Sequence, residues 1–176
     1  DIAVGAMTIL TSVMQFAMLP LQGLGQGAQP IISFNYGARN PDRVKAAFSL
    51  LLKASLVYST LLWACVMLFP QAFAALFTSS AGLLEFTQSA LRIYMACLLL
   101  FGIQIACQMT FTSLGYAKAS ILVAVMRKFI LLIPLIYILP YFLADKVFAV
   151  FLAEPVADFI AVSTTATLFY RQYKKL

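Results

Sequence analysis

Long apolar stretches, separated by short polar segments, follow one another along the whole chain. A helix that crosses a bilayer needs about 20 mostly apolar residues, because the hydrocarbon core is about 30 Å thick. Five stretches reach this length, near residues 2–34, 44–69, 87–113, 119–143 and 147–170. The pattern therefore predicts an all-α fold, a polytopic membrane helix bundle with five transmembrane spans. We expect residues 1–176 to form a single transmembrane helical domain.

The connections between these stretches contain residues that end and begin helices. Gly37 suits the left-handed conformation that commonly ends a helix, here the first span. Asn40 suits the N-cap of the second span and Pro41 its first helical position. Pro140 and Asp145 are expected to bracket the loop between the fourth and fifth spans. The sequence therefore predicts short turns between these spans.

Polar residues recur along one side of the first span. Steps of alternately four and three residues connect Thr8, Ser12, Gln15, Leu19, Gln22, Gln26, Gln29 and Ser33. Because an α-helix turns by about 100° per residue, these positions form one stripe. An unpaired amide in hydrocarbon costs several kcal/mol, so the stripe must face protein or a water-filled cavity. Two interpretations stay open: a substrate-binding wall formed by Gln15, Gln22, Gln26 and Gln29, or interhelical hydrogen bonding for packing alone.

Small residues and prolines interrupt the same span. Gly23 and Gly27 form a GxxxG pair beside the polar stripe, which allows close contact with another helix. Pro20 and Pro30 each remove a helical hydrogen bond and favour a kink. The run G-L-G-Q-G is not the dinucleotide-binding pattern and lacks its strand–turn–helix context. A nucleotide site is therefore not expected here.

Deep polar residues in two later spans are further candidates for function. Glu154 and Asp158 are four residues apart and share a face of the last span. Carboxylates at this depth suggest a proton or cation relay, and the alternative is a structural ion pair in which Arg92 is the partner of Glu154. Gln104 and Gln108 lie deep in the third span and are candidates for substrate binding. Hydrogen bonding between helices is the alternative for these two glutamines.

Composition excludes several classes of protein. The chain is 63% hydrophobic and only 10% charged, whereas an average soluble domain is about 25% charged. It contains no histidine, the commonest general base and metal ligand, and no HExxH, GxSxG or Walker A pattern. Its three cysteines lie in apolar runs without CxxC spacing. We therefore expect no enzyme, no catalytic residues, no metal site and no bound cofactor, and no nucleic-acid partner despite the net charge of +6.

The distribution of lysine and arginine predicts an orientation. Nine cationic residues are expected on one side of the membrane: Arg39, Arg43, Lys45, Lys118, Arg127, Lys128, Arg171, Lys174 and Lys175. The loops on the other side contain only Lys146. Because cytoplasmic loops carry the excess of lysine and arginine, the C-terminus is expected in the cytoplasm and Asp1 outside.

A family resemblance appears at residues 20–45. P-L-Q-G-L-G-Q-G-A-Q-P-I-I-S-F-N-Y-G-A-R-N-P-D-R-V-K resembles a helix and loop in the C-terminal half of MATE (multidrug and toxic compound extrusion) exporters, most of all their MepA-like bacterial branch. D-I-A-V-G-A-M at the start and G-Y-A-K-A-S before the fourth span are similar to other segments of the family. The resemblance implies that the chain is a C-terminal lobe fragment, helices eight to twelve of a twelve-helix, two-lobe transporter. Asn35 falls in the matching motif, which implies a place among the substrate-binding residues.

The resemblance also implies a function. Members export organic, mostly cationic or aromatic compounds by alternating access, and a sodium ion or proton drives this antiport. The expected partners are small organic substrates, the lipid bilayer and the missing N-terminal lobe, in a bacterial inner or plasma membrane. Two alternatives stay open. A flippase for lipid-linked oligosaccharides would carry more cationic groups at mid-depth, and a noncatalytic membrane scaffold subunit would need no solvent path.

Overall fold

Helices make up nearly all of the structure, a computed structural model that describes residues 2–174, with the backbone alone at residues 117 and 119. Across this part of the chain there is no strand, which confirms the predicted all-α class. The elements are α1 (Ile2–Gly37), α2 (Pro41–Leu68), α3 (Pro70–Ala75), α4 (Ala81–Tyr94), η1 (Leu98–Leu100), α5 (Phe101–Ser113), α6 (Ala117–Val125), η2 (Met126–Leu132), α7 (Ile133–Phe142) and α8 (Lys146–Tyr173).

Four helices are long and apolar enough to cross a membrane: α1, α2, Ser120–Phe142 and α8. A fifth span results when Ala81–Tyr94 and Leu98–Ser113, which meet at a bend of 43°, are taken as one. This third span differs from the predicted 87–113, because it begins at Ala81 and is broken in the middle. The number of spans agrees with the sequence pattern when the bent pair counts once.

Side chains of α2 form hydrogen bonds with the backbone at the break in the third span. The Trp63 indole Nε1 donates to the carbonyl oxygen of Ala96 at 3.0 Å, and the Ser59 hydroxyl donates to that of Leu99, also at 3.0 Å. A break leaves carbonyl groups without helical partners, and these donors satisfy two of them. The bend therefore depends on residues that lie more than 30 positions earlier in the chain.

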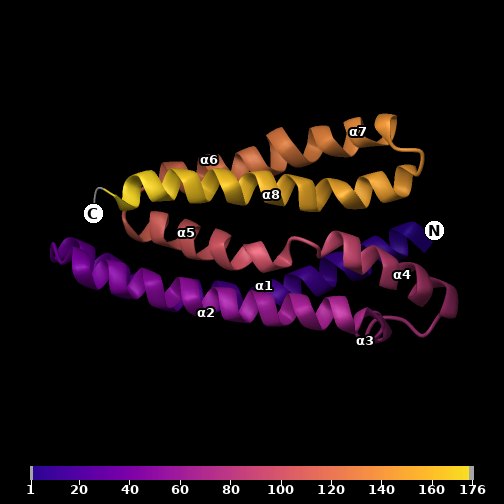
Figure 1. Cartoon of the computed structure of the whole chain (residues 1–176), viewed down its shortest axis with the longest axis horizontal. Coiled ribbons are helices and arrows are strands. Elements are labelled where there is room, and N and C mark those ends of the chain that lie inside the picture. Colours follow the sequence, from indigo (N-terminus) through magenta and orange to yellow (C-terminus); the bar gives the residue numbers. More distant parts are fainter. Residues whose placement is uncertain (1, 175–176) are drawn as a thin grey trace.

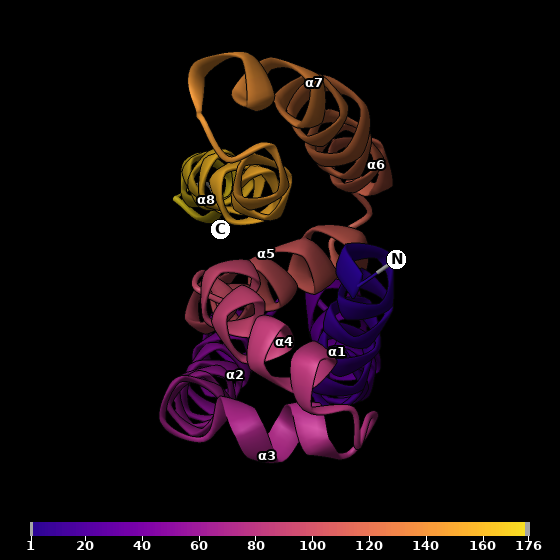
Figure 2. The ribbon, with the colours of Figure 1, turned by 90° about the vertical axis from the view of Figure 1, so that its right-hand side faces the viewer.

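Helix α5 lies at the centre of the bundle. It packs against α1 and α2 on one side and against α8 on the other, and the α6–α7 segment lies beyond, against α8 (Figures 1 and 2). Two clusters of buried side chains form the core. One joins α1 mainly to α4 and the start of α5, and the other joins α1, α2 and α5 to Phe169 of α8. Figure 1 shows the α1–α2 turn and the end of α8 together at one end, and the beginning of α1 at the other.

The helix ends follow the predicted signals in part. Asn40 is the N-cap of α2, as predicted, and its side chain accepts a hydrogen bond from the Arg43 backbone N–H. The left-handed residue after α1 is Arg39, with φ of 53°, whereas Gly37 is still helical. Asp145 caps α8 with its side chain, but Pro140 lies inside α7 and does not border the loop.

The GxxxG pair does not make the predicted helix contact within the described chain. Gly23 and Gly27 have open space where a side chain would begin, and both line a groove of about 1050 Å³ between α1 and α2. Gly25 makes the close approach instead, because a Cβ there would lie 2.5 Å from Cγ of Met109 on α5. The contact face of α1 therefore lies two residues away from the predicted position.

Two of the nine cationic residues lie away from the predicted interface. Arg127 is ten residues after Ala117, where α6 begins, and this corresponds to about 15 Å along the helix. Lys128 is its neighbour in the same segment, η2. Both therefore lie near the middle of their span and not at its end. Lys175 and Asp1, which the predicted orientation also used, lie outside the described residues.

Candidate functional site

A cavity of about 460 Å³ lies where α1, the bent third span, η2 and α8 meet. Three successive positions of the predicted polar stripe, Gln15, Leu19 and Gln22, form part of its wall. The other lining residues are Thr11, Met14, Met18, Tyr94, Phe101, Arg127, Lys128 and Glu154. The fold thus brings two of the predicted substrate-binding glutamines and one predicted relay carboxylate to the same cavity.

An ion-pair cluster borders this cavity. Arg127 Nε donates to Asp158 Oδ1 at 2.5 Å, and Arg127 Nη2 donates to Glu154 Oε1 at 3.1 Å. The guanidinium carbon lies 5.1 Å from the centre of the Phe101 ring. The partner of Glu154 is therefore Arg127, and the predicted pairing with Arg92 is wrong. Arg92 is exposed and lines a different cavity beside α3.

The local structure of the fourth span carries Arg127. Met126–Leu132 is π-helical, a widened form that occurs mostly at single turns and often at functional sites. Pro134 follows after one intervening residue and cannot donate the hydrogen bond that the carbonyl of Ile130 would accept in a regular helix. Sequence reasoning missed Arg127 because it counted this residue among the end charges. Its position eight residues after residue 119, the predicted start of the span, was the available signal.

Both carboxylates of the cluster are buried, which makes their charges costly without a counter-ion. Asp158 is 1% exposed and Glu154 is 7% exposed, and α8 is continuous through Pro155 between them. Asp158 Oδ2 is buried and has no hydrogen-bond partner among the described residues. A buried carboxylate without a counter-ion is strongly unfavourable, so Arg127 holds both charges in place. Lys128, the next residue, is exposed and also lines the cavity.

The remaining two glutamines of α1 do not line this cavity. Gln26 is exposed and Gln29 half-buried. Within the described part of the chain, the side chains of Gln15, Gln22, Gln26 and Gln29 make no hydrogen bonds. Packing between the helices of this chain therefore does not use these four glutamines, whereas Ser33 of the same stripe donates to the carbonyl oxygen of Ser113 on α5 at 3.0 Å. Its role in substrate binding stays a prediction.

Three other predicted substrate-binding residues lie elsewhere. The Asn35 side chain donates to the carbonyl oxygen of Ile31 at 2.8 Å and borders the α1–α2 groove. Gln104 Nε2 donates to Gln108 Oε1 at 3.5 Å, so these two pair along α5 itself. Gln104 is 5% exposed, and its Oε1 is a second buried oxygen without a partner in the described structure. The structure does not bring these three residues to the cavity wall.

Comparison with known proteins identifies the family. The MatE family model matches residues 1–138. The chain belongs to the MATE family. The FAD transporter of Shewanella oneidensis is 29% identical over 158 residues, which cover 90% of this chain and 34% of that protein. The chain is therefore a multi-pass membrane protein from a family of transporters, not enzymes.

Solved MATE structures share the fold. An inward-facing multidrug resistance MATE family transporter matches with a TM-score of 0.89 at 18% identity, over 99% of this chain and 42% of its own. An outward-facing one matches with a TM-score of 0.89 at 20% identity, over 98% and 39%. The MATE chain thus spans well under half the length of these relatives.

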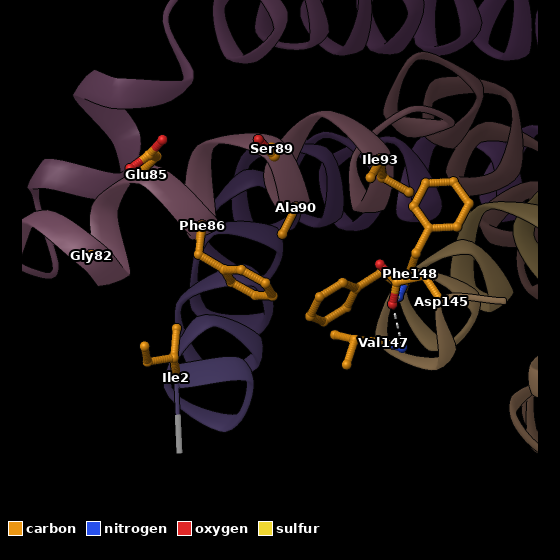
Figure 3. A pocket seen from close by; sticks show the side chains of 11 residues that line it. Ile2, Gly82, Glu85, Phe86, Ser89, Ala90, Ile93, Asp145, Val147 and Phe148 are labelled. Carbon is orange, nitrogen blue, oxygen red and sulfur yellow. Dashed lines mark hydrogen bonds between the residues drawn. The ribbon is translucent and has the colours of Figure 1, made fainter.

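A second cavity, of about 450 Å³, lies at the end of the helix bundle where α1 begins (Figure 3). Phe86 of α4 and Phe148 of α8 give it apolar walls. Figure 3 shows Glu85 and Asp145 at opposite sides of it. Asp145 Oδ1 already accepts hydrogen bonds from the backbone N–H groups of Val147 and Phe148, at 2.9 and 3.1 Å. This carboxylate therefore serves the start of α8.

A metal site is not found in the described part of the MATE chain. No three or more cysteine, aspartate or glutamate side chains of residues 2–174 lie close enough together to hold an ion. The Arg127 cluster contains two carboxylates, and each accepts a hydrogen bond from the same guanidinium. Chemically, two carboxylates beside a cavity can bind a cation or take up and release a proton.

Proposed function

We propose that this chain is the C-terminal part, helices eight to twelve, of a secondary-active antiporter of the MATE type. It would export organic, mostly cationic or aromatic compounds by alternating access, with sodium or proton entry as the driving force. The observation that carries the proposal is the cavity between the amides of Gln15 and Gln22 and the charged cluster of Arg127, Glu154 and Asp158. Amides bind polar groups of a substrate without strong charge selection, and carboxylates can bind and release a proton or a cation.

The exposed amides of α1 support a second lobe. Gln22 and Gln26 are exposed on α1, and an amide cannot face hydrocarbon without a partner. An N-terminal lobe would close the cavity over this stripe, in keeping with the partial coverage of the relatives. The equal fit to inward-facing and outward-facing transporters supports movement of these helices as one body. We place the C-terminus in the cytoplasm of a bacterial cell.

Export should depend on the deepest carboxylate. In cells that express the full-length transporter, the wild type is expected to lower accumulation of an aromatic cation such as ethidium. Asp158→Asn is expected to abolish most of this export, because the amide cannot take up and release a proton or cation. Glu154 still pairs with Arg127 in this variant, so the amount of protein in the membrane should be unchanged. Normal export by the variant would favour a purely structural ion pair.

The same cells test a second cargo. Lys128 lines the cavity without an ion pair in the described chain, which favours an anionic aromatic compound. FAD, the cargo named for the Shewanella oneidensis relative, carries a pyrophosphate and two aromatic ring systems. Flavin measured in the medium decides between the two cargo classes. A lipid-linked pyrophosphate, the cargo of a flippase, would appear in neither assay.

Water access separates a transporter from a scaffold. In a background without Cys65, Cys97 and Cys107, single cysteines at Gln15 and Gln22 are expected to react with a membrane-impermeant thiol reagent in the full-length protein. Cysteine at Leu10 or Leu21, both fully buried, should stay protected, and Ile121 serves as the exposed apolar control on the fourth span. Protection of both glutamine positions would contradict an aqueous pathway and favour the scaffold.

A further inference from the structure

The surroundings of Arg127 are those of a bound organic cation. Two carboxylates contact its guanidinium, at 2.5 and 3.1 Å, and the ring of Phe101 lies 5.1 Å from the guanidinium carbon. Charge-assisted hydrogen bonds to carboxylates and the face of an aromatic ring are the two interactions by which proteins hold such cations. Here a side chain of the protein itself fills the position.

We propose that Glu154, Asp158 and Phe101 form a cation cage that Arg127 occupies as an internal ligand, and that a free guanidinium compound from the cavity can take its place. The inference deepens the proposed function, on which it rests for the access of cargo, by naming guanidinium compounds as a substrate class. Binding of the cation to the cage is a separate property and can be measured without transport.

The cage has binding capacity that Arg127 does not use. Each carboxylate receives one hydrogen bond from Arg127, although a guanidinium and a carboxylate can form two parallel ones. Asp158 Oδ2 is buried without a partner among the described residues. A free guanidinium ion has six N–H donors and no tether to η2, so it can turn to satisfy Oδ2 as well. The cage therefore favours a planar cation with several donors over a compact ammonium ion.

Exchange can occur on the cavity side. The Arg127 side chain is 21% exposed and lines the cavity, whereas the Asp158 side chain is 2% exposed behind it. A displaced Arg127 would move into the cavity, next to the exposed Lys128. A cation that enters the cage thus raises the positive charge of the cavity by one, since Arg127 loses its carboxylates. This repulsion would help release the cargo when the cavity opens to the other side.

Removing the internal ligand tests the cage. The full-length transporter with Arg127→Ala is purified in detergent, and its thermal unfolding is measured in millimolar guanidinium chloride and in equal potassium chloride. At ten times its Kd, a ligand raises the ratio of folded to unfolded protein about elevenfold, so guanidinium should raise Tm relative to potassium. The wild type should respond much less, because its own Arg127 competes at high effective concentration. Arg127→Ala combined with Asp158→Asn should lose most of the response.

A matched control and a second variant keep the outcome decisive. Lys128→Ala removes the neighbouring cation but leaves the cage filled by Arg127, so its response to guanidinium should stay well below that of Arg127→Ala. If Arg127→Ala cannot be purified, Arg127→Met with Glu154→Gln leaves a single carboxylate to bind guanidinium. Equal Tm in the two salts, or failure to recover either variant with guanidinium present, overturns the cage. If guanidinium raises Tm in neither variant while the wild type exports its cargo, only this inference is contradicted. If guanidinium raises Tm but the wild type does not export, only the proposed function is contradicted.

Discussion

Arg127→Met is expected to lower the free energy of unfolding by about 3–5 kcal/mol, the range for removing one partner of a buried ion pair. The variant leaves Glu154 and Asp158, 7% and 1% exposed, without the guanidinium that both contact. Methionine has a similar length and fits the same space, so the loss reflects charge more than packing. Thermal unfolding of the purified full-length protein in detergent measures the effect.

Two comparisons separate this effect from a general sensitivity of the segment. Lys128→Met changes the adjacent residue, which is exposed and has no ion pair within the described chain, and it should alter stability by well under 1 kcal/mol. The triple variant Arg127→Met, Glu154→Gln, Asp158→Asn removes all three charges and should recover most of the lost stability. If Arg127→Met were as stable as Lys128→Met, the buried carboxylates would not depend on Arg127.

Gly102→Ala is expected to destabilise the bundle by about 1–3 kcal/mol, because α2 and α5 touch at this position without room for a methyl group. A Cβ on residue 102 would lie 2.6 Å from Ser59 Oγ and 2.7 Å from the carbonyl oxygen of Ser55. The second contact is backbone and cannot move aside easily. Ser59 Oγ also donates to the carbonyl of Leu99, so the methyl group would disturb the hydrogen bond that supports the bend.

Gly27→Ala is the matched control for this substitution. Nothing lies within 4 Å of a Cβ at residue 27, and alanine favours a helix over glycine by about 1 kcal/mol. The control variant should therefore be as stable as the wild type or slightly more stable. Equal melting temperatures for Gly102→Ala and Gly27→Ala in detergent would contradict the tight contact between α2 and α5.

Family membership did not depend on the details of the cavity. The segment at residues 20–45 resembles MATE exporters by its order of residues, and the family match over residues 1–138 confirms the family. The MepA-like branch and the numbering of the helices stay predictions. Asn35, which the resemblance implied as a binding residue, borders the α1–α2 groove. A motif therefore placed the chain in a family more securely than it assigned a role to one side chain.

The sequence by itself determined the helical class, the approximate spans and the faces of individual helices. Gln15 and Gln22 share a side of α1, and Glu154 and Asp158 share a side of α8, because the helical period fixes which residues of one helix lie together. The start of α2 at Asn40 followed for the same local reason. These properties depend on residues a few positions apart, so they can be read along the chain.

Only the tertiary structure decided which faces meet. It paired the carboxylates of α8 with Arg127 and not with Arg92, and it chose Gly25 over Gly23 for the close contact with α5. It also broke the third span where Trp63 of α2 supplies a hydrogen-bond donor. Each outcome depends on the rotation and depth of one helix against another. Packing of the whole bundle sets these quantities, and the period of a single helix does not contain them.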